Sequence, residues 1–245
     1  MSAFFARPST RLYFACFALL VLIKLLFDYY PGDFPARGQA AAFTWPIVLG
    51  ISLLAFLGFF ADRASGLPEP FADPTLERRG ILIAVASGTI YAAVMIARFI
   101  FLRDPSAVDP LSGGGWPHML LPWSVPFYAF GAILLEFMLR LGALYILFWF
   151  FYVVVARKHG RQLIFWILAT TISLYEIAPY LAEDIGRHNW HGAGGEFIEP
   201  LYLFNVFECW LLLRYGWFAP IVFRLSQYFV WHVLFGGVAG TFFGH

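Results

Sequence analysis

Six ionisable side chains lie inside long apolar stretches of this 245-residue chain. They are Glu136, Arg140, Glu176, Glu208, Arg224 and His232. A lone charge at the middle of a bilayer costs roughly 2.5–3.5 kcal/mol even on permissive insertion scales, so such groups pair, perform a function, or both. Carboxylates beside guanidiniums can form a structural ion-pair network. A carboxylate with a polar partner can instead activate water or relay ions.

Residue spacing predicts which of these side chains share a helix face. Glu136 and Arg140 are four residues apart, hence one turn apart on one face. Asn205 and Glu208 are three apart and also share a face. A continuous stripe at three- to four-residue spacing follows: Arg224, Gln227, Tyr228 and His232. The buried polar network predicted from these faces contains Glu136, Arg140, Asn205, Glu208, Arg224, Gln227 and Tyr228.

The depth of each charge follows from a helical rise of about 1.5 Å per residue. By this count Glu136 and Glu208 lie near mid-membrane, and Arg224 lies about level with Arg140. Glu176 and His232 are expected at a similar depth in the outer half. Balanced acidic and basic groups favour a structural network, and a catalytic or transport site is the alternative.

Composition indicates an integral membrane protein. The chain is 61% hydrophobic and only 13% charged, about half the charge of a soluble domain. The formal net charge of +1 gives no basis for a nucleic-acid partner, and the bilayer is the expected environment. Cys16 and Cys209 have no metal-binding spacing, and no motif identifies a cofactor.

The predicted fold is all-α with about seven transmembrane helices. The expected spans are residues 12–28, 42–61, 80–102, 127–156, 162–182, 197–214 and 217–243. Residues 1–110 supply three peripheral helices, and residues 111–245 supply four that form a bundle with a polar interior. The fourth span is either one tilted helix or a pair kinked near Gly142. Asp73-Pro74 predicts a helix start, with Asp73 as N-cap.

Lysine and arginine placement predicts the orientation. With the N-terminus inside, inner segments hold nine of these residues and outer loops three, or five if Lys24 and Arg98 point outward. The chain is therefore expected in a bacterial-type inner membrane with a cytoplasmic N-terminus and an outer C-terminus.

Two segments resemble a known family. Leu134 to Gly142, which contains Glu136 and Arg140, resembles the Glu-Glu-x-x-x-Arg motif of the CAAX-protease and bacteriocin-processing (CPBP) intramembrane proteases. The stretch from Trp210 to Arg224 is similar to the closing segment of that family. The resemblance spans residues 127–235 at most.

The departures from the family pattern concern its catalytic positions. Leu135 stands where the water-activating glutamate belongs, and Glu176 and Arg224 stand at histidine positions. Tyr228 stands at the asparagine position. The resemblance thus implies a degenerate, non-catalytic member that acts as an accessory or structural subunit with protein partners in the membrane.

Two other functions stay open. An active endopeptidase would use an altered residue set, with Glu136 as base, His232 as its partner and Arg224 as oxyanion donor, supported by Arg140 and Glu176. The third possibility is a lipophilic-cofactor binder or a small transporter.

Two further patterns are structural in our interpretation. Gly236, Gly240 and Gly244 form a small-residue series on one helix face, which lets another helix approach closely. His188 and His191 have metal-ligand spacing, but the glycines that follow predict a solvated loop and no metal site.

Overall fold

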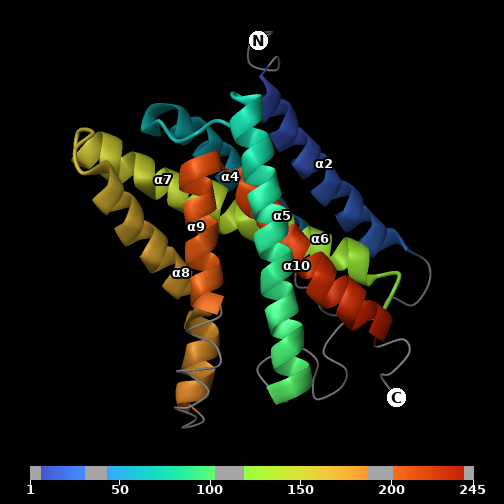
Figure 1. Ribbon diagram of the computed structural model, residues 1–245. Helices are drawn as coiled ribbons and strands as arrows, with labels where there is room; N and C mark the ends of the chain where they lie inside the picture. The colour runs from blue at the N-terminus through green and yellow to red at the C-terminus, as the bar shows by residue number, and fades with distance from the viewer. Residues whose placement is uncertain (1–6, 31–42, 103–118, 187–200, 240–245) are drawn as a thin grey trace.

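The computed structural model describes residues 7–30, 43–102, 119–186 and 201–239, and all regular structure in these ranges is helical (Figure 1). The α-helices are α2 (Pro8–Tyr29), α4 (Trp45–Ser65), α5 (Pro74–Ala97), α6 (Ser124–Glu136), α7 (Tyr145–Phe148), α8 (Arg161–Gly186), α9 (Leu203–Tyr215) and α10 (Phe218–Tyr228). Wider, π-helical turns continue four of them as η1 (Arg98–Leu102), η4 (Phe137–Leu144), η5 (Trp149–Val155) and η7 (Phe229–Ala239).

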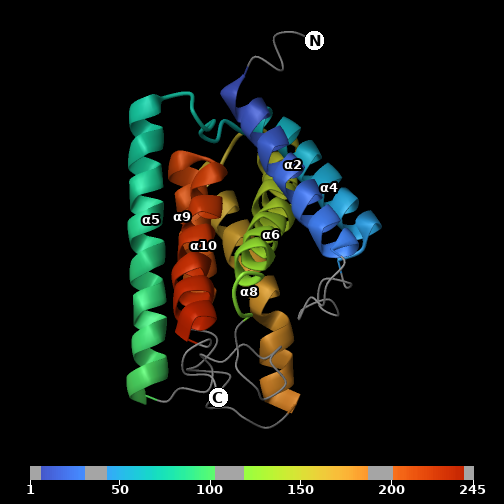
Figure 2. The same ribbon diagram turned by 90° about the vertical axis from the view of Figure 1, so that its right-hand side faces the viewer.

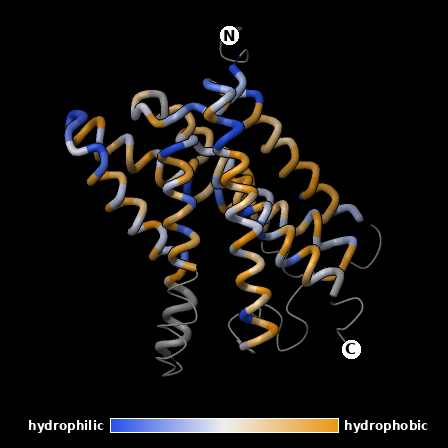
Figure 3. Tube along the Cα trace, viewed as in Figure 1, coloured by the Kyte–Doolittle hydropathy of each residue, from blue (hydrophilic) through white to orange (hydrophobic). Residues whose placement is uncertain are grey.

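The predicted all-helical fold class is confirmed, and so is the presence of helices able to cross a membrane. Four helical runs in the described ranges have the required length and composition: Pro8–Tyr29, Pro74–Phe101, Ser124–Val155 and Phe218–Gly237. A shorter apolar run, Trp45–Ala61, lies in the second expected span. Apolar residues follow the lengths of these helices, and hydrophilic residues collect at the turn before α8 (Figure 3).

The start of α5 follows the local sequence signal. Asp73 is the N-cap, and its Oδ1 accepts hydrogen bonds from the backbone N–H groups of Thr75 at 2.9 Å and Leu76 at 3.2 Å. Pro74 occupies the first turn, where its missing N–H breaks no helical hydrogen bond. The predicted cap is therefore confirmed.

The fourth expected span is one uninterrupted helical run, Ser124–Val155. Gly142 lies within η4, so the place considered for a kink is instead a stretch of wide turns. Such turns add a residue locally and shift the faces that later side chains present. This run lies oblique to α5 and α9 (Figure 1).

The first two helices pack against the α6–η4 run, α2 mainly against α6 and α4 mainly against η4 (Figure 2). The hydroxyl of Tyr13 in α2 donates to the Ser52 carbonyl in α4 at 2.6 Å, and its ring stacks on Phe137 at 5.2 Å between centroids. The α4 backbone approaches η4 closely at Gly58, where an added Cβ would lie 1.7 Å from the carbonyl oxygen of Leu141. Only a residue without a side chain fits there.

A second close approach joins α5 to α10, which lie alongside one another in Figure 2. A Cβ on Gly88 would lie 2.5 Å from the Phe223 carbonyl oxygen, one residue before Arg224. The α9–α10 turn is held at Gly216, whose φ of +85° is a conformation that glycine adopts readily. These contacts fix α10 between α5, α6 and α9.

Candidate functional site

Buried charged and polar side chains from α6, η4, α8, α9 and α10 meet in the interior of the fold. This group, called the charged network below, consists of Glu136, Arg140, Glu176, Asn205, Glu208 and Arg224. Its contacts join residues up to 88 positions apart in the sequence. The network therefore ties together helices that are remote along the chain.

Arg140 contacts two other helices, α8 and α9, through its two terminal nitrogens. Nη1 donates to Oε2 of Glu176 at 2.7 Å. Nη2 donates to Oε2 of Glu208 at 2.5 Å and to Oδ1 of Asn205 at 2.9 Å. Glu136, one turn earlier on the same helical run, is looser, with 3.7 Å between its Oε1 and Nη1. The planar guanidinium thus bridges α8 and α9 from η4.

Arg224 binds the same carboxylates from the opposite helix, α10. Its Nη2 donates to Oε2 of Glu208 at 2.6 Å and to Oε1 of Glu176 at 3.0 Å. Its Nε donates to Oε1 of Glu136 at 2.7 Å and to Oε1 of Glu208 at 3.0 Å. Two guanidiniums therefore share Glu176 and Glu208.

The network is almost completely shielded. Arg140, Asn205 and Glu208 are 0% exposed, Glu136 1% and Arg224 2%. The side chain of Glu176 is 11% exposed and is the most accessible of the charged members. Burying an ion costs several kcal/mol, and this cost is offset only by close opposite charges and satisfied hydrogen bonds. Removing one member leaves the others buried without compensation.

The network contains three carboxylates but only two guanidiniums, so its formal charge is one negative. All four oxygens of Glu176 and Glu208 accept hydrogen bonds from arginine. Three polar atoms of the network have no hydrogen-bond partner among the described residues: Oε2 of Glu136, Nε of Arg140 and Nδ2 of Asn205. The oxygen could still accept a hydrogen bond, and the two nitrogens could still donate one.

A groove of about 710 Å³ reaches the edge of the network. Its apolar lining consists of Leu135, Met138, Leu139, Ala178 and Leu201. Its polar lining consists of Tyr175, Glu176, Arg224 and Tyr228. Tyr175 is 70% exposed, so its ring lies at the outer side of the groove. The charged network is therefore accessible from outside along the Glu176 side.

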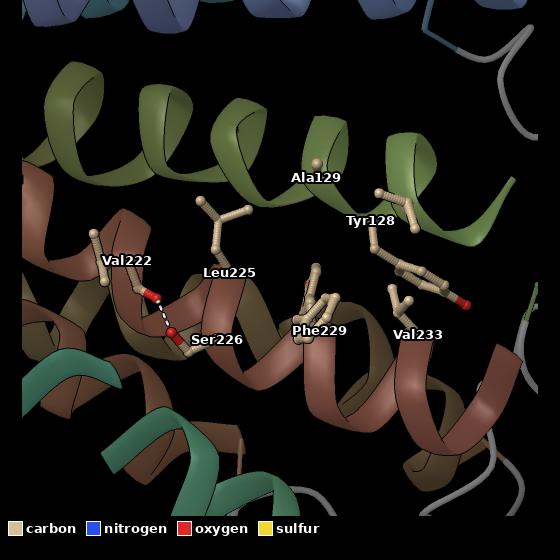
Figure 4. Close-up of a pocket in the computed structure, with 9 residues that line it drawn as sticks. Tyr128, Ala129, Val222, Leu225, Ser226, Phe229 and Val233 are labelled. Atoms are coloured by element: carbon tan, nitrogen blue, oxygen red, sulfur yellow. Dashed lines mark hydrogen bonds between the residues drawn. The ribbon is translucent and has the colours of Figure 1, made fainter. Parts of the chain in front are cut away.

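A second, smaller pocket of about 330 Å³ lies between α6 and the α10–η7 run (Figure 4). Among its lining side chains, the Ser226 hydroxyl donates to the Val222 carbonyl at 2.7 Å within the same helix. The hydroxyl of Tyr128 accepts from the backbone N–H of Met119 at 3.2 Å. This pocket is lined without a charged side chain and is separate in character from the groove.

Five of the residues selected from the sequence meet in the network: Glu136, Arg140, Asn205, Glu208 and Arg224. Glu176 also belongs to the network, because its carboxylate binds both arginines, and so the expected layer in the outer half, apart from the other charges, is wrong. The His232 ring instead stacks on Tyr128, with 4.0 Å between centroids. Rise per residue measures depth only along an upright helix, whereas these helices are inclined to one another (Figure 1).

The remaining polar residues of the predicted stripe lie beside the network. Gln227 is buried, and the Tyr228 ring centroid lies 6.0 Å from Cζ of Arg224. Phe204 in α9 covers the same guanidinium, with its ring centroid at 5.0 Å. Aromatic rings thus flank Arg224, a favourable arrangement for a buried cation.

The small-residue face of the last helix is described only in part. Gly236 is buried, whereas Gly240 and Gly244 lie outside the described residues. A close approach occurs at Gly237, where an added Cβ would lie 3.0 Å from Oγ of Ser124. The histidine loop with His188 and His191 also lies outside the described residues, and the described ranges contain no cluster of metal-ligating side chains.

The chemistry open to this arrangement is limited. A guanidinium cannot be deprotonated in proteins, so Arg140 and Arg224 cannot act as proton acceptors. Both oxygens of Glu176 and of Glu208 are engaged by these arginines. Glu136 is the carboxylate that retains an unengaged oxygen, and that residue is 1% exposed. Binding and helix pairing fit this geometry better than water activation does.

Comparison of the chain with protein families, with curated proteins and with solved structures finds no match.

Proposed function

We propose that this chain is a non-catalytic multi-pass membrane protein that serves as an accessory or structural component of a membrane assembly. The observation that carries the proposal is that Arg140 and Arg224 each bind both Glu176 and Glu208. Such sharing is typical of a network that fixes helix positions, because the guanidinium nitrogens that make these contacts are directed at carboxylates of other helices.

The resemblance to CPBP proteases fits the same proposal. The positions that would carry the family's catalytic groups hold Leu135, Glu176 and Arg224 in this chain. Leu135 lines the apolar groove, while Glu176 and Arg224 are ion-paired at 3.0 Å. A site with an ion pair at the two histidine positions keeps a polar centre, but both groups of the pair are engaged with each other.

We extend the proposal to seven spans in a bacterial-type inner membrane, with the N-terminus in the cytoplasm. The start of α5, the turn before α8 and the end of α9 lie toward one end of the helices in Figure 1. The basic residues at this end include Arg78, Arg79, Arg157, Lys158 and Arg214. Nη2 of Arg161 donates to the Gly66 carbonyl at 2.9 Å, which supports placing the α4–α5 connection on the same side as the start of α8. Cytoplasmic loops carry the excess of lysine and arginine.

Extraction in mild detergent followed by size-exclusion chromatography tests the accessory role. The wild-type protein is expected to migrate in a complex with other membrane proteins, and harsher detergent should release it as a single chain. Migration as a single chain under all conditions would contradict an accessory role.

One observation favours an intramembrane endopeptidase as the second candidate. Oε2 of Glu136 is buried without a described partner and is the one carboxylate oxygen of the network left for a base. Cleavage of transmembrane model peptides by reconstituted wild-type protein decides between the two. We expect no cleavage by wild type or by Glu136→Gln. Cleavage by wild type that a folded Glu136→Gln variant lacks would establish the peptidase.

A further inference from the structure

The charged network carries one negative charge that its own members do not balance. Glu136, Glu176 and Glu208 face two guanidiniums, those of Arg140 and Arg224. Four of these five residues are between 0% and 2% exposed. An uncompensated charge is so costly in such surroundings that a buried group is normally paired, bound to a metal or made neutral by a proton. The network therefore needs one more positive charge.

The titratable groups that face the network from its surroundings do not supply that charge. Tyr91 of α5, Cys209 of α9 and Tyr228 of α10 face it, and phenols and thiols carry no positive charge. Arg98 of η1 lies near Tyr91, but the strongest charges that act on the carboxylates of α8 and α9 are those of the network itself.

The charged groups of the other helices that pack against α6 are engaged elsewhere. Lys24 of α2 forms an ion pair with Asp28, one turn later on the same helix. The His232 ring of η7 stacks on Tyr128, at 4.0 Å between centroids. The acidic and basic residues of α4 lie in its last turn. In the described ranges the cations bound to the network are thus its own two arginines.

A metal ion does not match the oxygens that remain. All four oxygens of Glu176 and Glu208 accept hydrogen bonds from arginine. Oε2 of Glu136 is the carboxylate oxygen of the network without a hydrogen-bond partner among the described residues. Metal ions take four or more ligands, whereas a proton needs a single oxygen. The geometry therefore favours a proton.

The hydrogen bonds also select the carboxylate that can hold this proton. Oε1 of Glu136 accepts from Nε of Arg224 at 2.7 Å, and a proton on Oε2 leaves that contact intact. A proton on Glu176 or Glu208 would lie on an oxygen that faces an arginine N–H, so a hydrogen bond would be lost. Glu136 alone among the three can become neutral without losing an arginine contact.

We propose that the charged network binds one proton at neutral pH, held by Glu136 as an O–H group at Oε2. The proton is taken from water, and the three carboxyl groups then carry two negative charges against the two guanidiniums. The inference goes beyond the proposed function. It concerns the charge state of the buried network and holds whether or not the protein belongs to a larger assembly.

Infrared spectroscopy of the purified full-length protein in maltoside micelles tests the proposal. A protonated carboxyl group has a C=O stretching band separate from the bands of a carboxylate, and maltoside contains no carbonyl group. We expect wild-type protein at neutral pH to show this band, with a shift in heavy water, and folded Glu136→Gln to lose it. An acid band that is unchanged in folded Glu136→Gln would overturn the proposal.

The matched control is Glu77→Gln. Glu77 is the buried carboxyl group that the described ranges contain outside the network, at 6% exposed, and it accepts from the Phe71 backbone N–H at 3.1 Å. Glu77→Gln should keep the acid band of the network. Absence of any acid band from this variant at neutral pH would also overturn the proposal, and this outcome requires no substitution in the network.

The pH dependence of unfolding gives an independent readout. Glutamate in an unfolded chain is ionised above about pH 5.5, so the folded wild type holds one proton more than the unfolded chain, and unfolding becomes more favourable as pH rises. The unfolding equilibrium constant of wild type relative to Glu136→Gln should increase about tenfold per pH unit between about pH 5.5 and 7. The ratio of wild type to Asp73→Asn, an exposed carboxylate, should stay constant. A constant ratio for Glu136→Gln as well would contradict a bound proton.

Discussion

Arg140 and Glu208 are joined across 68 residues of sequence by a 2.5 Å contact between Nη2 and Oε2, with both side chains fully buried. The contact is one of several that each side chain makes within the network. Its energetic weight depends on the planar shape of the guanidinium as much as on its charge.

The shape of the guanidinium is tested by Arg140→Lys. The ammonium keeps the charge but is a single point, so it cannot reach Glu176 and Glu208 in the forked geometry that Nη1 and Nη2 provide. We expect Arg140→Gln to lower the free energy of unfolding by about 3–5 kcal/mol and Arg140→Lys to lower it by a smaller but clear amount. Unfolding in mixed detergent micelles measures both.

The matched control for this prediction is Arg161→Lys. Arg161 is exposed and donates to the Gly66 carbonyl, a contact that an ammonium can also make. Its effect should stay within about 0.5 kcal/mol. If Arg140→Lys lowers the free energy of unfolding by no more than Arg161→Lys does, the forked geometry of the guanidinium does not contribute to stability.

Energetic coupling between Arg140 and Glu208 is the second prediction. A double-mutant cycle with Arg140→Gln and Glu208→Gln should give an interaction energy of about 0.5–3 kcal/mol, since each single variant leaves the other group buried without its partner. Combining Arg140→Gln with the distant Asp73→Asn should be additive to within about 0.5 kcal/mol. Additivity in the first cycle would argue against a structural network.

The contact of α4 with η4 gives the third prediction. Gly58→Ala places a Cβ 1.7 Å from the Leu141 carbonyl oxygen, so the two helices must separate next to Arg140. We expect a marked fall in the thermal unfolding temperature. Gly50→Ala on the same helix has no atom within 4 Å of its added Cβ and should be neutral or raise stability by up to about 1 kcal/mol. Similar behaviour of the two variants would refute the close approach.

The helix cap at Asp73 gives the fourth prediction. Asp73→Ala removes the acceptor for the Thr75 and Leu76 N–H groups and should cost about 1 kcal/mol in unfolding free energy. Asp73→Asn retains an oxygen in the same place and should cost much less. Thermal unfolding of the two variants checks this, and an Asn variant as unstable as the Ala variant would indicate that Asp73 acts in another way.

Features set by neighbouring residues are those that the sequence predicts. The cap at Asp73 and the one-turn spacing of Glu136 and Arg140 depend on the backbone of a single helix. The same local reasoning places helices in all seven expected spans. Periodicity and capping signals are sufficient for this because they involve only residues within a few positions of each other.

Features that depend on the angle between helices cannot be predicted from periodicity and capping signals. Glu176 joins the network because α8 packs against α9. One turn before Glu176, Oγ of Ser173 lies 4.0 Å from Sγ of Cys209 in α9. Ser173 and Glu176 are three residues apart and therefore share a helix face, but this spacing gives no crossing angle. The close approaches at Gly58 and Gly88 likewise depend on which helices become neighbours. The sequence of one helix alone does not determine its neighbours.

The order of the network along the chain has a consequence for biogenesis. Glu136 and Arg140 leave the ribosome first. Glu176 in α8 follows 36 residues after Arg140, and Arg224 in α10 follows 88 residues after Glu136. Until α8 is made, the two charges have only each other, at 3.7 Å. We expect the helical run that carries them to leave the insertion machinery only together with the later helices that complete the network. Release into lipid is then coupled to completion of the chain, so a truncated product lacking α10 is expected to be recognised and degraded.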